Sequence, residues 1–203
     1  MARADALASM PLSVLADLLG RRLPRDTTRD KGFVGTLVEQ ALGATAENRS
    51  VPDFERLGVE LKTVPVQAER PKESTFVCTA TPREAETRSW ADSALHHKTR
   101  RILWVPVEAD PQLPLGVRRL GAPLLWSPSA EQDQQIEEDW TQLAKGSWQQ
   151  LSAREGVLVQ LRPKAAHGRI RRADDEVPRA WYFRRRFVMA LFEAAFLEHS
   201  PEP

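Results

Sequence analysis

Residues 52–63 read PDFERLGVELKT, and this stretch carries the most informative pattern in the chain. Its second half predicts a β-strand that begins at Gly58, and side chains alternate between the two faces of a strand. One face then receives the uncharged side chains, which are Val59, Leu61 and Thr63. Glu60 and Lys62 project together from the other face.

Asp53 lies shortly before this strand, close enough for a turn to return its carboxylate to Glu60. Two carboxylates and an ammonium at one place suit the hydrolysis of a phosphodiester, because Mg²⁺ prefers oxygen ligands and keeps several waters. Asp53 and Glu60 would each supply an oxygen, and the main-chain carbonyl of Leu61 a third. Lys62 would orient the attacking water or stabilise charge in the transition state. The alternative is a strand whose solvated face carries an ion pair.

Two further residues are candidates for the same site. Glu39 falls on a helix predicted for residues 31–42, where it is either the polar edge of the helix or another carboxylate near the metal. Lys98 falls in the basic run HHKTRR at residues 96–101, and its alternative is a solvated charge run. The two histidines of this run have no cysteine nearby and no third histidine at a suitable spacing, so they do not predict a metal site.

The rest of the chain mixes helical and strand patterns. Helices are predicted over residues 11–19, 31–42, 131–145 and 184–199. Strands are predicted over residues 58–66, 74–80, 101–107, 124–126 and 157–161. The polar residues 69–72 predict a hairpin or meander between the first two strands. This order predicts a mixed α/β or α+β fold with a central group of consecutive strands.

The composition is that of a globular domain with unevenly distributed charge. The chain has 203 residues, of which 41% are hydrophobic, and a net charge of +1. These values predict a single domain and do not by themselves indicate a nucleic-acid binder. Residues 162–186, however, contain nine Lys or Arg against three acids, whereas residues 131–139 contain five acids and no base. The basic stretch could meet phosphates, and the alternative is a solvated surface of uneven charge.

Cys78 is the only cysteine, which excludes an internal disulfide and a cysteine-based zinc site. It lies in an apolar run, which predicts a buried, inert thiol. No segment approaches the roughly 18 apolar residues that a membrane span requires. We therefore expect a soluble protein in the reducing cytoplasm.

Several blocks of the sequence, in order, resemble the MutH family of DNA mismatch repair endonucleases. The first blocks are RDKGFVG at 29–35, Glu39 with LGA at 42–44, and DF at 53–54 with LGVELKT at 57–63. The later blocks are TFVC at 75–78, HK at 97–98 with LWVPVE at 103–108, PLLWSP at 123–128 and RPKAA at 162–166. Together they cover most of the chain, and each is longer and more specific than the spacing of the charged residues alone.

The resemblance implies a restriction-endonuclease-like fold of the PD-(D/E)xK type, with a central mixed sheet flanked by helices and two lobes that form a DNA cleft. The N-terminal lobe, with the catalytic core, would cover about residues 1–128, and the C-terminal lobe, with the DNA-reading elements, about residues 129–203. The implied activity is nicking of the unmethylated strand at hemimethylated GATC sites. It would use magnesium, with manganese as a substitute, and MutL as activator. We expect a monomer that acts on double-stranded DNA.

The family's active-site residues can be carried over by motif. Asp53, Glu60 and Lys62 match the catalytic triad. Glu39 matches an additional active-site carboxylate, and Lys98 matches an active-site lysine. Two more residues fall in matched blocks near the DNA, Lys31 and Phe76.

The C-terminal lobe would carry the residues that sense methylation. Arg162 and Lys164 match the family's Arg-Pro-Lys block, and Tyr182 matches a tyrosine that packs near the adenine amino group. Adenine presents N6 in the major groove, and a methyl there changes both shape and hydrogen bonding. A close-fitting aromatic ring can therefore reject the methylated base. Phosphate contacts are expected from the following arginines, Arg184, Arg185 and Arg186.

The chain departs from the family in two segments. Residues 167–178 are shorter than expected between the RPK block and Tyr182, which concerns methyl sensing. The region before residue 29 is short and unmatched, which concerns lobe geometry and the surface that meets MutL. Two other functions stay open at this point. A restriction endonuclease would cut both strands of GATC and need a dimer, because the chain carries one catalytic core. A non-catalytic DNA-binding relative would lack metal ligands.

Overall fold

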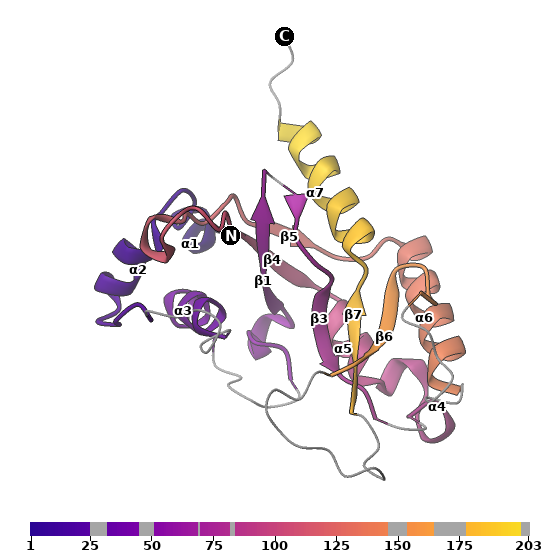
Figure 1. The fold of residues 1–203 in the computed structure, drawn as a ribbon. Coiled ribbons are helices and arrows are strands. Elements are labelled where there is room, and N and C mark those ends of the chain that lie inside the picture. Colours follow the sequence, from indigo (N-terminus) through magenta and orange to yellow (C-terminus); the bar gives the residue numbers. More distant parts are fainter. Residues whose placement is uncertain are drawn as a thin grey trace, which may run out of the picture. The chain divides into compact units, whose positions relative to one another are not determined.

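The computed structural model describes residues 1–24, 32–44, 51–68, 70–81, 84–145, 154–164 and 178–199 (Figure 1). The chain divides into two compact units. The first contains Met1–Glu73, Arg100–Ser127 and the residues from Met189 onward. The second contains Ser74–Thr99 and Pro128–Val188. In the part of the chain that is described, no helix is long and apolar enough to cross a membrane.

A four-stranded mixed sheet forms the centre of the first unit. Its strands, in spatial order, are β2 (Arg70–Pro71), β1 (Glu60–Gln67), β4 (Ile102–Glu108) and β5 (Leu124–Trp126). β1 and β4 run parallel, with Glu60 opposite Ile102 and Lys62 opposite Trp104. The two edge strands are antiparallel to their neighbours. β4 is buried along nearly its whole length, as expected for a parallel strand that is covered on both faces.

Helices cover both faces of this sheet. The helical elements that precede β1 are α1 (Ala2–Asp5), α2 (Leu12–Leu18), α3 (Phe33–Leu42) and the short turn η1 (Glu55–Leu57), and η3 (Leu115–Val117) follows β4. Apolar residues of α1, α2 and α3 form one core with strand residues that include Leu61 and Leu103. Trp104, on the opposite face of β4, contacts Phe192 of α7 (Arg185–His199), with ring centroids 6.4 Å apart.

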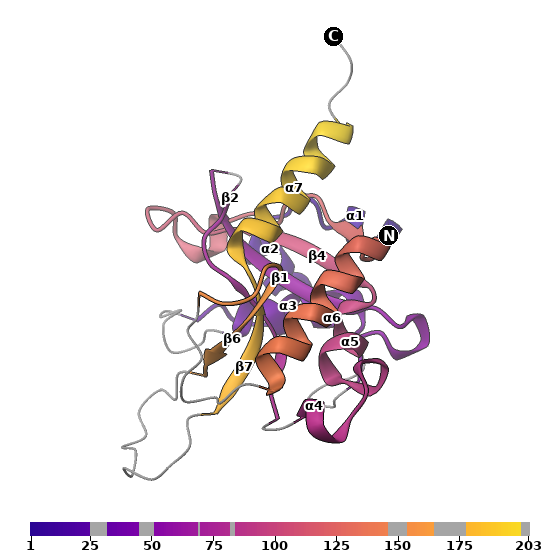
Figure 2. The same cartoon turned by 90° about the vertical axis from the view of Figure 1, so that its right-hand side faces the viewer.

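The second unit is built on a three-stranded antiparallel sheet. Its strands, in spatial order, are β3 (Thr75–Thr79), β7 (Arg179–Phe183) and β6 (Val159–Pro163). The helical elements are α4 (Glu84–Thr87), η2 (Trp90–Asp92), α5 (Ala94–Thr99) and α6 (Ala130–Lys145). One face of the sheet carries the buried side chains of Cys78, Val159, Leu161, Trp181 and Phe183. α6 packs against β6 (Figure 2), and Cys78 is a buried free thiol, as predicted.

The structure confirms the predicted mixed fold and most of the predicted elements. The hairpin predicted between residues 58–66 and 74–80 is wrong, because the only antiparallel partner of β1 in the described residues is the two-residue β2, and β3 pairs with β7. Pro65 explains this in part, since its carbonyl accepts the Lys72 N–H at 3.0 Å but it has no N–H to return the bond. β3 lies in the second unit, together with the other residues of Ser74–Thr99. The lobe boundary near residue 128 stays a prediction. Strand β7 is an element that the sequence patterns did not predict.

Candidate functional site

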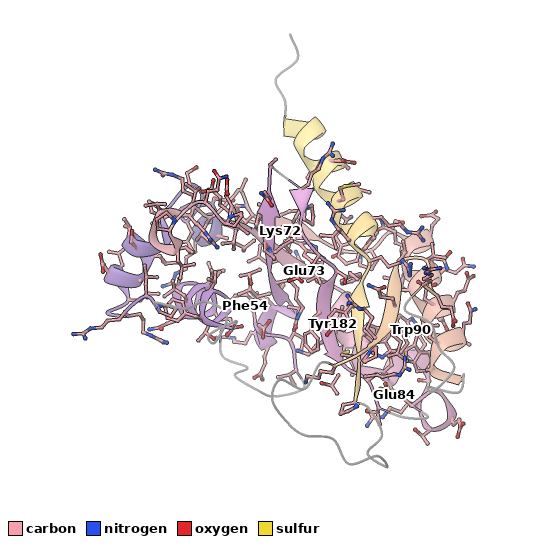
Figure 3. All side chains as sticks on the ribbon, in the orientation of Figure 1. Phe54, Lys72, Glu73, Glu84, Trp90 and Tyr182 are labelled. Carbon is pink, nitrogen blue, oxygen red and sulfur yellow. The ribbon has the colours of Figure 1, made fainter. Side chains whose placement is uncertain are left out.

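The turn before β1 returns Asp53 to the strand, as the sequence predicts. Asp53 Oδ2 accepts a hydrogen bond from the N–H of Leu61 at 2.8 Å. Two main-chain bonds between Phe54 and Val59, of 2.9 and 3.3 Å, close the turn, and Phe54 lies beside β1 (Figure 3). Gly58 has a φ of +60°, a left-handed conformation that glycine adopts without a steric penalty. This geometry holds the carboxylate of Asp53 at the start of β1.

The main chain of Leu61 points to the same edge of β1 as Asp53. The N–H of Glu60 donates to the carbonyl of Arg101 at 2.9 Å, and therefore points toward β4. In a strand, the N–H and C=O of one residue point to the same edge, and successive residues alternate between edges. The carbonyl of Leu61 thus points away from β4, to the edge where Asp53 contacts its N–H. Asp53 and the Leu61 carbonyl share one edge of the strand.

Glu60 and Lys62 form a close ion pair on one face of β1. Lys62 Nζ lies 2.6 Å from Glu60 Oε1, and the side chains are 12% and 3% exposed. The alternation of the strand predicted that the two would project together. The alternative of a pair on a solvated face is wrong, because both charges are withdrawn from water. Removing such a pair from water costs about as much as its attraction returns, so stability alone does not account for it.

The donor atoms at the start of β1 fit magnesium. Asp53 and Glu60 supply carboxylate oxygens, and Leu61 a carbonyl oxygen. Among the described residues, no three His, Cys, Asp or Glu side chains form a cluster that could hold a metal. A metal here would consequently depend on two carboxylates, one carbonyl and water. Mg²⁺ is commonly bound in this way, through one or two carboxylates and several waters, whereas a structural zinc site takes four protein ligands.

Glu39 lies beside β1, and Lys98 lies in the other unit. On α3, a Cβ placed on Gly35 would be 3.6 Å from Thr63 Oγ1 and 4.0 Å from Glu39 Oε1, so the Glu39 carboxylate lies near Thr63. Thr63 shares its strand face with Leu61 and not with the ion pair. Lys98 is a half-buried residue of α5 in the second unit. The active-site roles of both residues stay predictions.

The structure brings together four of the residues that the sequence connects with DNA, on one face of the second sheet. Phe76 on β3 and Tyr182 on β7 are opposite each other, with ring centroids 5.6 Å apart and planes at 79° (Tyr182 is labelled in Figure 3). Arg162 lies over the Tyr182 ring at 5.3 Å, and Lys164 over the Phe76 ring at 5.6 Å. We call these four residues the aromatic–cation face. It combines exposed positive charge with two rings, a combination suited to nucleic acid.

Two hydroxyl groups of β3 and its flank hold the cations of this face, and sequence reasoning missed both. Ser74 Oγ accepts a hydrogen bond from Arg162 at 2.6 Å. Thr79 Oγ1 accepts one from Lys164 Nζ at 3.2 Å. Ser74 and Arg162 are 88 residues apart in the chain, and Thr79 and Lys164 are 85 residues apart. No local sequence signal could have joined them.

The arginines predicted to contact phosphate lie around the end of β7 and the start of α7. Arg184 donates hydrogen bonds to the carbonyls of Arg154 at 3.2 Å and Glu155 at 2.8 Å. Burial, followed by the neighbouring charge of Arg186, lowers the pKa of Arg184. Its guanidinium thus braces the segment before β6, and the phosphate contact expected from it stays a prediction. Arg185 is exposed at the start of α7. One further candidate, Lys31, lies outside the described residues.

Comparison with known proteins places these features in context. A family model described as "DNA mismatch repair enzyme MutH" matches residues 42–139, a range that contains Asp53, Glu60, Lys62, Phe76 and Lys98. DNA mismatch repair proteins MutH from Salmonella paratyphi B, Salmonella newport and Salmonella heidelberg are each 42% identical to this chain over 214 residues. Each alignment covers 99% of this chain and 93% of the relative. The similarity thus extends across both units.

Proposed function

This chain belongs to the MutH family of DNA mismatch repair enzymes, and we propose that it nicks the unmethylated strand of hemimethylated GATC sites. The observation that carries the proposal is the arrangement at the start of β1. There the Asp53 carboxylate bonds the Leu61 N–H at 2.8 Å, and the buried Glu60 carboxylate lies 2.6 Å from Lys62 Nζ. A half-buried carboxylate beside a buried carboxylate–ammonium pair is suited to phosphodiester hydrolysis.

Asp53, Glu60 and the Leu61 carbonyl are the groups that would hold magnesium, or manganese in its place. A bound divalent ion would polarise the phosphate and make the attacking water more acidic. Asp53 contributes through its fixed position, because the turn and the Leu61 N–H restrain its carboxylate before any ligand arrives. Such preorganisation lowers the cost of assembling the site on DNA.

Lys62 would act on the phosphate directly. Its ammonium is held by Glu60 and is 12% exposed, so it can still reach a ligand. A cation in a site that excludes water stabilises developing negative charge more strongly than it would in solvent. Glu39, beside Thr63, would add a further carboxylate to those of Asp53 and Glu60. Lys98 would assist through its positive charge.

The aromatic–cation face would read the DNA. Tyr182 presents an aromatic edge on which an N6-methyl group would be rejected, while the unmethylated amino group would be accepted. Arg162 and Lys164 would fix the register of the duplex through phosphates or base edges. Because both cations lie over rings, their side chains are restrained before DNA binds.

The number of cuts per binding event follows from the proposed single catalytic centre. One set of Asp53, Glu60 and Lys62 per chain favours one cut per binding event by a monomer on double-stranded DNA. MutL would serve as the activator, and we expect the enzyme to work in the cytoplasm.

The test is nicking, with magnesium, of three matched duplexes that carry one unmethylated, hemimethylated or fully methylated GATC. Each is assayed with and without MutL, for the wild type, Lys62→Ala and the control Lys72→Ala. Lys72 is an exposed lysine of the same unit whose ammonium donates to the Ala109 carbonyl at 3.1 Å. We expect cuts confined to unmethylated strands, stimulated by MutL, absent in Lys62→Ala and retained in Lys72→Ala.

Other outcomes would identify a different protein. Double-strand cutting without MutL, by a dimer, would indicate a restriction-type endonuclease. Binding of DNA without metal-dependent cutting of any duplex would indicate a non-catalytic relative. Equal activity of Lys62→Ala and the wild type would refute the proposed role of Lys62 whatever the substrate.

A further inference from the structure

An apolar pocket of about 370 Å³ lies beside the turn that carries Asp53. This is within the size range of small-ligand and side-chain pockets, roughly 300–1,000 Å³. All of its lining residues belong to the first unit. Its apolar wall includes Leu42, Phe54, Leu57, Val59 and Leu125. Two members of this wall, Phe54 and Val59, are the residues whose main-chain bonds close the Asp53 turn.

Two arginines also line the pocket, Arg3 and Arg101. Both side chains belong to exposed residues, and neither forms an ion pair with a residue in the described part of the chain. Arg3 donates a long hydrogen bond of 3.5 Å to the carbonyl of Leu42, at the end of α3. The pocket thus combines apolar walls with positive charge that no carboxylate of the described ranges neutralises.

Leu57 leaves part of the apolar wall open to solvent. It is 68% exposed at the end of η1, so its side chain extends the apolar wall of the pocket to the molecular surface. A free small molecule is normally enclosed over most of its surface, which this open wall does not allow. A phosphate backbone would require clustered cations and gains little from aliphatic walls. The open, apolar and cationic character is best matched by a segment of another polypeptide.

We propose that this pocket binds a peptide segment of a partner protein, in which one or two large apolar side chains fill the cavity and a neighbouring carboxylate pairs with Arg101. Binding of the segment does not depend on the proposed function. Only its consequence for nicking does.

That consequence follows from the shared turn. A side chain packed on Phe54 and Leu57 would order the turn whose hydrogen bonds hold Asp53 against the Leu61 N–H. Because the turn's conformation and the occupant's binding are coupled, whatever stabilises one stabilises the other. The occupant would therefore favour the arrangement of Asp53 that suits a divalent ion, and it would lower the magnesium concentration needed for nicking.

Binding is tested by methyl NMR of the full chain with the peptide acetyl-Leu-Phe-Glu-amide and its neutral counterpart acetyl-Leu-Phe-Gln-amide. We expect saturable shifts of the Leu42, Val59 and Leu125 methyls, with Val159 and Leu161 of the second unit unchanged. An exposed ion pair should make the Glu peptide about two- to fivefold tighter than the Gln peptide. Arg101→Gln should abolish that difference, and the control Arg56→Gln, on the same turn but outside the pocket wall, should keep it.

A second pair of variants tests the apolar contact. Leu57→Ala should weaken both peptides, whereas Leu18→Ala, a leucine of equal exposure at 69% on α2, should weaken neither. The proposal is overturned if the pocket methyls do not move at millimolar peptide, if both peptides bind the wild type equally, or if Leu18→Ala acts like Leu57→Ala. Nicking with titrated magnesium is then measured with and without the Glu peptide. If the peptide binds but the magnesium concentration needed for nicking is unchanged, the coupling to Asp53 is refuted. If the wild type never nicks, the proposed function is refuted and the binding result still stands.

Discussion

The buried Glu60–Lys62 pair yields a quantitative prediction about stability. Glu60 is 3% exposed, and its contact with Lys62 Nζ is 2.6 Å. Lys62→Met removes the ammonium and leaves a carboxylate that is almost fully shielded from water. Breaking a fully buried pair in this way costs about 3–5 kcal/mol. Because Lys62 is 12% exposed, water can enter part of the vacated space, so we expect a loss of about 2–3 kcal/mol in the free energy of unfolding.

The double variant Glu60→Gln with Lys62→Met should recover most of that loss. Both new side chains are uncharged and close in volume to the originals, and replacement of a whole buried pair is often neutral or stabilising. We expect its unfolding free energy to be within about 1 kcal/mol of the wild type, so that the effects of the two single changes are not additive. The double variant should nevertheless be inactive in nicking, like Lys62→Met.

The measurement is urea unfolding of the wild type, both single variants and the double variant, with EDTA present so that no metal stabilises the folded state. Lys72→Met, at an exposed lysine, is the control and should lose only about 1 kcal/mol, from the one hydrogen bond that Lys72 donates to the Ala109 carbonyl. If the double variant is as unstable as Lys62→Met, the pair is a net stabiliser of the fold. The inference that the charges are retained for chemistry would then be refuted.

Three further predictions concern other parts of the two units. Asp53→Asn retains an oxygen that can accept the same main-chain N–H, so the free energy of unfolding should change by less than about 1 kcal/mol. Nicking should fall about a hundredfold or more, because a charged metal ligand is lost. A near-normal nicking rate would exclude Asp53 from the site. Thr79→Val removes the hydroxyl acceptor of Lys164 and should weaken binding to a GATC duplex about two- to tenfold, with the nicking rate at saturating DNA unchanged. Thr79→Ser should restore binding; if it does not, packing matters at this position and the hydroxyl does not. Arg184→Ala should lower the unfolding free energy by about 1–3 kcal/mol, since two carbonyls lose their donor, but it should leave the salt dependence of DNA binding unchanged. Lys164→Ala should reduce the slope of log binding constant against log salt concentration by about one. An equal reduction of this slope in both variants would restore Arg184 as a phosphate contact.

Local periodicity predicted strand β1 and its candidate site well, because the relevant pattern is contained in a dozen residues. The alternation of β1 correctly assigned Glu60 and Lys62 to one face, and the proximity of Asp53 in sequence indicated the returning turn. The parallel pairing of β1 with β4 is compatible with the same pattern, since both strands are rich in β-branched and aliphatic residues. These features could be predicted because all of the residues that determine them lie close together in the sequence.

Pairing between distant segments could not be derived in this way. β3 was predicted as a strand, but its partner β7 begins about a hundred residues later, and strand partners depend on the tertiary fold and not on local propensity. Arg184 shows the same limit for charge. An arginine in a cationic run looks like a phosphate contact, yet here its guanidinium is used on the carbonyls of Arg154 and Glu155. The tethering of Arg162 by Ser74 likewise depends on neighbours that only the folded sheet provides.

The order in which the chain visits its two units has a consequence for biosynthesis. The polypeptide leaves the first unit at Ser74, returns at Arg100, leaves again at Pro128 and returns at Met189. Phe192, which covers Trp104 and is 3% exposed, is therefore translated near the end of the chain. While the ribosome is still making the second unit, the sheet that carries Asp53, Glu60 and Lys62 lacks part of its cover. A nascent or prematurely terminated chain would thus hold all three residues without the complete unit that supports them, and no single proteolytic cut can release either unit whole.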